Sequence, residues 1–167
     1  RRVLFRSMNE DLKYRKAEPA DAERIMEIIR QAQAQMRALG SLQWQDGYPA
    51  RADIDRDIAR GYGYVFEKSD AAENPAAAET PQKYDKGTVP GGVIAYGAVV
   101  FDGEPAYGAI DGAWLTGGDY VVLHRLAVAD GEKGRGVAAE FMRRTEALAR
   151  GRGVGSFRVD TNFRSEE

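Results

Sequence analysis

The chain contains no cysteine, and His124 is the only histidine among its 167 residues. Without cysteine there are no disulfides, thiolate metal sites or cysteine nucleophiles, and a single histidine removes the ligand set of zinc hydrolases. No apolar run approaches the roughly eighteen residues that span a bilayer, and the N-terminus lacks the apolar core of a signal peptide. These absences predict a cytoplasmic protein with no metal and no membrane partner.

The chain also lacks an excess of charge of either sign. Its 24 Lys and Arg residues oppose 26 Asp and Glu residues, so the formal net charge is −2, and no block of about five cations is present. A nucleic-acid partner is therefore not expected. With 43% apolar and 30% charged residues, the composition is that of one domain with a sizeable core.

Both ends of the chain look foreign to this domain. Residues 1–7 precede a plausible start at Met8, and residues 163–167 follow a predicted strand that has barely ended. The tetrapeptides Leu-Phe-Arg-Ser and Arg-Ser-Glu-Glu in these segments resemble translations of the two strands of a common sequencing adapter. We therefore expect a non-native leader at 1–7, one domain at 8–162 and a non-native tail at 163–167. The alternative is a pair of ordinary disordered termini.

Hydrophobic periodicity predicts strands that alternate with helices. The segment 120–128 is apolar nearly throughout, so we expect a strand buried on both faces. The segment 69–90 is expected to be a loop insertion, and 104–118 an irregular excursion over the sheet. Together the elements predict an α/β fold, an α+β mixed sheet with helices on its faces. Strands are expected at 12–17, 62–67, 92–101, 120–128 and 154–160, and helices at 19–39, 53–60 and 136–150.

A glycine-rich turn at 130–136 lies between the strongest predicted strand and the helix at 136–150. Free N–H groups and the helix dipole favour an anion there, and Gly134 and Gly136 let a phosphate approach the backbone. A P-loop is excluded because Gly-Lys-(Ser/Thr) is absent, and a Rossmann fingerprint is excluded because the glycines at 151–155 precede a strand. Strand, turn, helix and strand form a βαβ unit, in which a purely structural turn is the remaining alternative.

Two adjacent segments carry a family resemblance. His-Arg-Leu-Ala-Val at 124–128 and Lys-Gly-Arg-Gly-Val-Ala at 133–138 resemble the acetyl-CoA signature of the GNAT superfamily of N-acetyltransferases, (Arg/Gln)-x-x-Gly-x-(Gly/Ala). Lys133 stands where that signature has Arg or Gln. A weaker likeness to one bacterial subgroup extends to the first helix, to Gln-Trp-Gln-Asp-Gly-Tyr-Pro at 43–49 and to Asp-Thr-Asn at 160–162.

The resemblance implies a mostly antiparallel central sheet and acetyl-CoA as cosubstrate. It implies that the backbone of 126–128 pairs with the pantetheine arm, that the turn 133–138 holds the pyrophosphate, and that the Val128 N–H stabilises the oxyanion. The family usually continues with another helix, often bearing a thiolate-protonating tyrosine, and with further strands, so we expect a truncated domain. The implied cofactor-binding residues are Leu126, Ala127, Val128, Lys133, Gly134, Arg135, Gly136, Val137, Ala138 and Asn162.

Direct acetyl transfer to an amine requires a base for the ammonium proton. His124 is the first candidate, because histidine ordinarily titrates near neutral pH. We expect it on the same strand face as Leu126 and Val128, with Arg125 on the opposite face as a structural ion partner. Glu67, at the end of a strand, is the second candidate base. A structural role is the alternative for both candidates.

The acceptor is expected to be a primary amine of a small molecule, a peptide or a protein. Its pocket is expected from the loops 40–50 and 102–119. Trp44, Asp46 and Tyr48 are candidate substrate-binding residues, with a packed turn as the alternative. Two other function classes stay open: a non-catalytic acyl-CoA-binding or sensing module, and an interaction domain that has lost CoA binding. A homodimer is also open.

Overall fold

The computed structural model describes residues 12–69 and 92–159. The expected leader and tail, Asn162, and all of the expected insertion except Ser69 lie outside these ranges.

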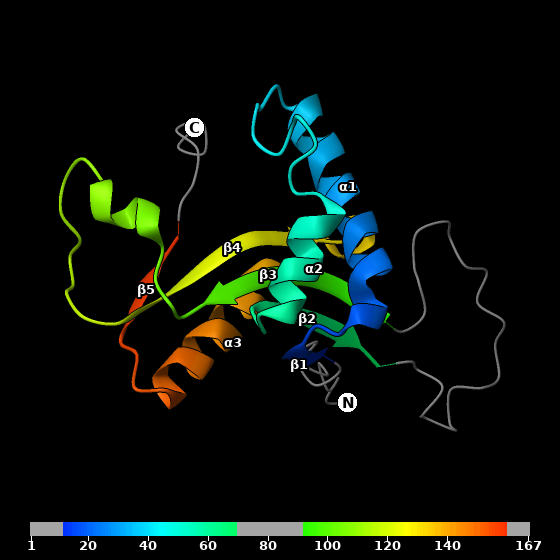
Figure 1. Cartoon of the computed structure of the whole chain (residues 1–167). Coiled ribbons are helices and arrows are strands. Elements are labelled where there is room, and N and C mark those ends of the chain that lie inside the picture. Colours follow the sequence, from blue (N-terminus) through cyan, green and yellow to red (C-terminus); the bar gives the residue numbers. More distant parts are fainter. Residues whose placement is uncertain (1–11, 70–91, 160–167) are drawn as a thin grey trace, which may run out of the picture.

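A five-stranded sheet in the order β1-β2-β3-β4-β5 forms the centre of the domain (Figure 1). The first four strands pair antiparallel, whereas β5 runs parallel to β4 after the crossover through α3. The expected mixed, mostly antiparallel sheet and its βαβ unit are confirmed. The strands are β1 (Leu12–Lys16), β2 (Gly63–Lys68), β3 (Gly92–Val100), β4 (Tyr120–Val128) and β5 (Ser156–Arg158).

Helices cover both faces of the sheet (Figure 1). The helices α1 (Ala22–Ala38) and α2 (Arg51–Ala59) pack on one face, and α3 (Val137–Gly151) packs on the other. The apolar positions of α1 recur every three to four residues, so Ile25, Ile28 and Ile29 share one face and are fully buried against the sheet. Short 3-10 turns are η2 (Pro19–Asp21), η4 (Pro105–Ala109) and η5 (Asp130–Glu132).

The core under α3 depends on a glycine in the middle of β3. A Cβ on Gly97 would lie 2.8 Å from Cε1 of Phe141 and 2.9 Å from Cδ1 of Leu123. Phe141 is fully buried and packs edge-on against Phe66, with ring centroids 5.2 Å apart. The missing side chain at Gly97 therefore lets α3 approach the sheet closely.

We expect Gly97→Ala to lower the free energy of unfolding by about 1–3 kcal/mol, because the added methyl overpacks the core. Urea denaturation monitored by fluorescence measures the change. Gly117→Ala is the control, since a Cβ at Gly117 meets no atom within 4 Å. Equal midpoints for the two variants would contradict this account of the packing.

A β-bulge interrupts β4 at Arg125. Ala98 of β3 pairs with His124, but Tyr96 pairs with Ala127, so β4 advances three residues while β3 advances two. Arg125 has φ +56, in the left-handed region that a residue with a side chain rarely adopts. One inserted residue of this kind reverses the alternation of side chains along the rest of the strand.

The bulge overturns two expectations from strand alternation. Leu126 and Val128 pack with the cluster under α3, whereas His124 and Arg125 line the cleft beside α2. The predicted shared face of His124 with Leu126 and Val128 is therefore wrong, and so is the predicted opposite face for Arg125. The predicted burial of β4 on both faces is also wrong at the bulge, where His124, Arg125 and Leu126 are only half-buried.

Candidate active site

The edge of β4 that faces β5 is unpaired along part of its length. β5 pairs with β4 only at Tyr120–Val122, and no strand of the described residues pairs with this edge further on. The amide of Ala129 donates to the Ile94 carbonyl of β3 at 2.8 Å. Because successive amides of a strand point to opposite edges, the N–H of Val128 and the polar backbone groups of Leu126 point to the unpaired edge.

Ala127 is placed differently from its two neighbours. By the same alternation its backbone N–H and C=O point to β3, where it pairs with Tyr96. Its side chain is buried in the core under α1. Of the three residues expected to bind along the strand, the structure presents Leu126 and Val128 to a ligand at the unpaired edge.

This edge leads into the glycine turn at the start of α3. Gly134 and Gly136 both have φ +75, a conformation that glycine adopts without steric cost. A Cβ built at either glycine would meet no atom within 4 Å, so the space beside the turn is open. Gly136 is the N-cap and supplies no side-chain acceptor, so the N–H groups of Val137 and Ala138 have no acceptor within the helix. Such a helix start binds anions.

The charged side chains of the turn are held by neighbouring groups. Lys133 Nζ donates to Asp130 Oδ1 at 2.6 Å and also to Gln35 of α1. Arg135 Nη1 lies 3.3 Å from Glu132 Oε2, and Arg135 remains exposed. Lys133, which takes the place of the signature Arg or Gln, therefore ties the turn to α1.

Two clefts meet at the bulge of β4. The edge cleft, about 470 Å³, follows the unpaired edge, and the α2 cleft, about 410 Å³, lies between α2 and η4. Tyr48, His124 and Arg125 line both clefts. The edge cleft is also lined by Met36, Gln43, Trp44, Leu123, Leu126, Met142 and Val159. The α2 cleft is also lined by Arg56, Asp57, Arg60, Tyr62, Val100, Gly103, Glu104, Pro105, Ala106 and Tyr107.

His124 stands between the two clefts beside a carboxylate. Its Nε2 lies 3.2 Å from Oε2 of Glu104, and its side chain is 17% exposed. Glu104 also accepts a hydrogen bond from the Ala106 amide at 3.2 Å, which fixes the carboxylate at the start of η4. At this distance the carboxylate pairs with the imidazole charge when His124 holds a proton. Glu104 was missed from the sequence, where its only signal is the Glu-Pro that opens a 3-10 turn.

Arg125 is bound by a buried carboxylate on α2. Its Nε and Nη2 donate to Asp57 at 2.9 and 2.6 Å, and its Nη1 donates to the Tyr48 hydroxyl at 2.7 Å. Tyr96 donates to the same carboxylate at 2.6 Å, and Asp57 is 4% exposed. The expected ion-pair role of Arg125 is confirmed. These hydrogen bonds hold the bulge of β4 against α2.

Charge and burial act together in this network. Burial lowers the pKa of the Arg125 guanidinium, but the hydrogen bonds and charge of Asp57 raise it by more, so its pKa lies above the usual value. Burial raises the pKa of Tyr96, and the charge of Asp57 raises it further. Both side chains therefore stay protonated and keep donating to Asp57.

We expect Asp57→Ala to lower the free energy of unfolding by about 3–5 kcal/mol, because it leaves the Arg125 charge buried and unpaired. Urea denaturation measures the loss, and the double variant Asp57→Ala/Arg125→Met is expected to lose less. Asp55→Ala is the control: Asp55 pairs with Arg51 on the exposed face of the same helix, so its loss stays within about 1 kcal/mol. A double variant as unstable as Asp57→Ala would overturn the unpaired-charge explanation.

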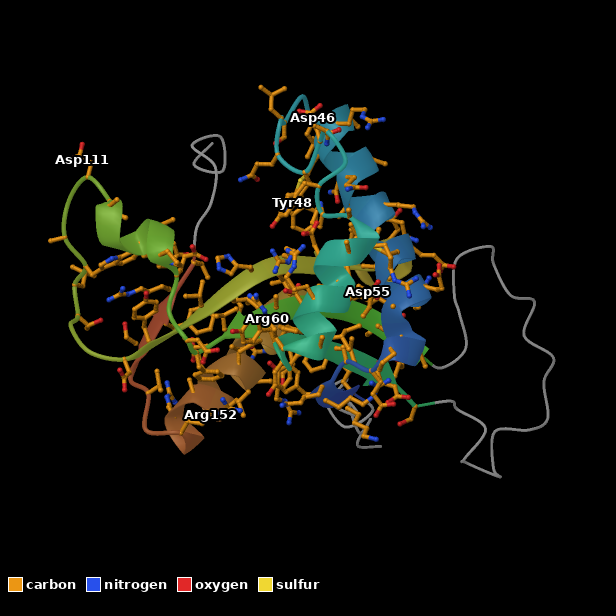
Figure 2. The ribbon with its side chains drawn as sticks, viewed as in Figure 1. Asp46, Tyr48, Asp55, Arg60, Asp111 and Arg152 are labelled. Carbon is orange, nitrogen blue, oxygen red and sulfur yellow. The ribbon has the colours of Figure 1, made fainter. Side chains whose placement is uncertain are left out.

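The remaining candidates from the sequence separate into two groups. Trp44 lines the edge cleft, and Tyr48 points from its loop toward β4 (Figure 2). Asp46 is exposed at the tip of that loop and lines neither cleft (Figure 2). Glu67 accepts from Arg15 Nε at 2.7 Å on β2 and likewise lines neither cleft. The structure therefore brings Trp44 and Tyr48 to His124 and leaves Asp46 and Glu67 apart.

The described residues also bear on membrane spans and metal sites. Within 12–69 and 92–159, no helix combines the length and the apolar character needed to cross a bilayer. Across the same ranges, His, Asp and Glu side chains nowhere gather in a group of three or more that could hold a metal ion.

Several solved structures with a similar fold are named as acetyltransferases. A GNAT-family acetyltransferase from Streptococcus agalactiae 2603 is 31% identical, with a TM-score of 0.69, and the match covers 91% of this chain and 76% of that one. A GNAT-family acetyltransferase from Listeria monocytogenes 4b F2365 is 19% identical, with a TM-score of 0.65 and coverage of 93% and 79%. A predicted acetyltransferase from Clostridium acetobutylicum, crystallised with acetyl-CoA, is 15% identical, with a TM-score of 0.54 and coverage of 93% and 84%.

No protein-family model matches the chain, and neither does any curated protein. The fold and the 31% identity to the streptococcal protein over most of both chains nevertheless define the class as acetyltransferase. The chain belongs to the GNAT family, as the resemblance at 124–138 predicted.

Proposed function

We propose that this protein transfers the acetyl group of acetyl-CoA to a primary amine by direct attack of the amine on the thioester. The observation that carries the proposal is the unpaired edge of β4 at Leu126 and Val128, which leads directly into the open turn at Gly134 and Gly136. The acetyl-CoA in the crystals of the clostridial structural neighbour supports the same cosubstrate.

The pantetheine arm would add to the unpaired edge as an extra strand. Its amide groups would pair with the backbone N–H and C=O of Leu126 and Val128, the mode by which extended ligands bind strand edges. The pyrophosphate would then reach the start of α3, where the amides from Gly134 to Ala138 and the helix dipole favour an anion. Lys133 and Arg135 add positive charge next to this site, which partly offsets the nearby Asp130 and Glu132.

Two groups of the protein, the Val128 N–H and the His124 imidazole, would each take one role in the chemical step. The amine nitrogen attacks the thioester carbonyl, the C–N bond forms, and the C–S bond breaks to release the CoA thiolate. The outward N–H of Val128 would stabilise the oxyanion that forms on the carbonyl oxygen. His124 would accept the proton that the attacking amine loses, and the Glu104 carboxylate, 3.2 Å from Nε2, would stabilise the resulting positive charge.

Each of the two clefts would bind one of the two substrates. The edge cleft, lined by Leu126, would hold the acetylated end of the cosubstrate, and the α2 cleft would hold the acceptor. His124 lines both clefts, which supports a role as the base where the amine would meet the thioester. Tyr48 and Trp44 would close the junction from the loop above it.

Thiol release measures the proposed reaction directly. Purified chain with acetyl-CoA and a panel of primary amines should release one free thiol for each amide that mass spectrometry detects. Acetyl-CoA binding without thiol release for any amine would refute the enzyme and favour the sensing module. A folded chain that binds no acetyl-CoA would refute both.

A further inference from the structure

The α2 cleft combines two kinds of charged group. Its lining includes the acid–base pair His124 and Glu104, and also Arg60, which follows the last turn of α2. Figure 2 shows Arg60 at the end of α2 next to the sheet. The cleft volume of about 410 Å³ is in the range of small-molecule sites.

Most charges of this cleft already have a partner within the protein. Asp57 is engaged by Arg125, and Arg56 pairs with Asp53 at 3.1 Å. Among the described residues, no carboxylate lies within ion-pair distance of Arg60. The guanidinium of Arg60 is therefore the cation of this cleft that is left for a ligand.

A second hollow reinforces the positive charge around Arg60. This hollow, about 140 Å³, adjoins the α2 cleft and shares Arg60 and Tyr62 with it. Lys16 and Arg152 also line it, and Arg152 stacks over the Phe101 ring at 4.2 Å. The one carboxylate of the hollow, Asp102, accepts a hydrogen bond from the Tyr62 hydroxyl at 2.5 Å. Three cations against one carboxylate leave the surroundings of Arg60 positive.

We propose that the acceptor is a small amine that also carries an anionic oxyacid group, as an amino acid does. The ammonium would enter at Glu104 and His124, and the oxyacid would take the fork of the Arg60 guanidinium, which suits carboxylate and phosphate alike. This assignment rests on the proposed acetyl transfer to an amine. It deepens that function by naming the substrate class that the α2 cleft selects.

Matched acceptors test the assignment through kcat/KM for thiol release. Each anionic acceptor is compared with the amine that lacks only its carboxylate: glycine with methylamine, β-alanine with ethylamine, and 4-aminobutyrate with propylamine. Phosphoethanolamine tests whether a phosphate can replace the carboxylate. At least one anionic acceptor should exceed its neutral match by about tenfold or more, the effect of one charged hydrogen bond. Arg60→Gln should bring the ratio of kcat/KM between each anionic acceptor and its neutral match close to one, and Arg60→Lys should restore part of the preference.

Arg30→Gln is the control variant, because Arg30 is exposed on α1 and lines neither cleft. Its acceptor preference should equal that of the wild type. Turnover of the neutral amines without any preference for their anionic matches would overturn the substrate class and leave the proposed function standing. A preference that survives Arg60→Gln would overturn the role of Arg60, and no turnover of any amine would reject the proposed function and the substrate class together.

Discussion

Gly136→Trp is expected to abolish measurable binding of acetyl-CoA. The indole would fill the open space beside the turn, where the pyrophosphate would accept hydrogen bonds from the first amides of α3. Loss of two charge-assisted hydrogen bonds weakens binding by about 100-fold or more. Isothermal titration of acetyl-CoA into the wild type and the variant measures the difference.

Gly153→Trp is a closely matched control. Gly153 has φ +75, the same value as Gly136, and a Cβ at either position meets no atom within 4 Å. Both substitutions therefore carry the same backbone strain, about 1–2 kcal/mol for a left-handed residue with a side chain. Gly153 follows the C-terminal end of α3, at the opposite end of the helix from the proposed anion site.

The pair of variants separates binding from stability. Equal thermal stability with binding lost only in Gly136→Trp supports the pyrophosphate turn. Loss of binding in both variants would trace the effect to backbone strain, and retained binding in Gly136→Trp would place the cosubstrate elsewhere.

His124→Gln is expected to lower kcat for thiol release by about 10²–10⁴-fold, the usual contribution of a general base. Glutamine keeps much of the size and polarity of the ring but accepts no proton at neutral pH. The Kd for acetyl-CoA should stay unchanged, because the proposed cosubstrate contacts are backbone groups of Leu126, Val128 and the turn. Steady-state kinetics and titration measure the two quantities separately.

Glu67→Gln distinguishes the two bases predicted from the sequence. Glu67 is bound to Arg15 and lines neither cleft, so its loss should leave kcat within about twofold of the wild type. A large fall in kcat for Glu67→Gln and none for His124→Gln would reverse the assignment of the base.

The core of the candidate site was predictable because its signals are local. Each element is specified by its own residues: the strand by the apolar run at 120–128, the turn by the glycines at 134 and 136, and the helix by the apolar spacing after them. The connection is so short that these three elements must follow one another directly in space. These segments are β4, the turn and α3 in the structure. The cytoplasmic location, the absence of a nucleic-acid partner, a homodimer and the domain boundaries at 8 and 162 stay predictions.

The face on which His124 lies could not be predicted from strand alternation. The bulge at Arg125 places His124 on the opposite face from Leu126 and Val128. No sequence pattern near residue 125 predicts this bulge. A left-handed arginine is costly by itself, and it is held here by Asp57, 68 positions earlier in the chain. Only the packing of α2 onto the sheet supplies that partner.

The sequence by itself determined the order of elements, the glycine turn before α3 and the family, because hydrophobic period and glycine conformation act within a few residues of one another. The tertiary structure decided which side chains meet at the junction of the two clefts. It placed Glu104 beside His124, put Arg60 in the lining of the α2 cleft, and left Asp46 and Glu67 outside both clefts. These pairings join residues from separate loops, strands and helices. Their geometry is set by the register of β3 with β4 and by the packing of α2 on the sheet. Both depend on contacts between residues far apart in the sequence.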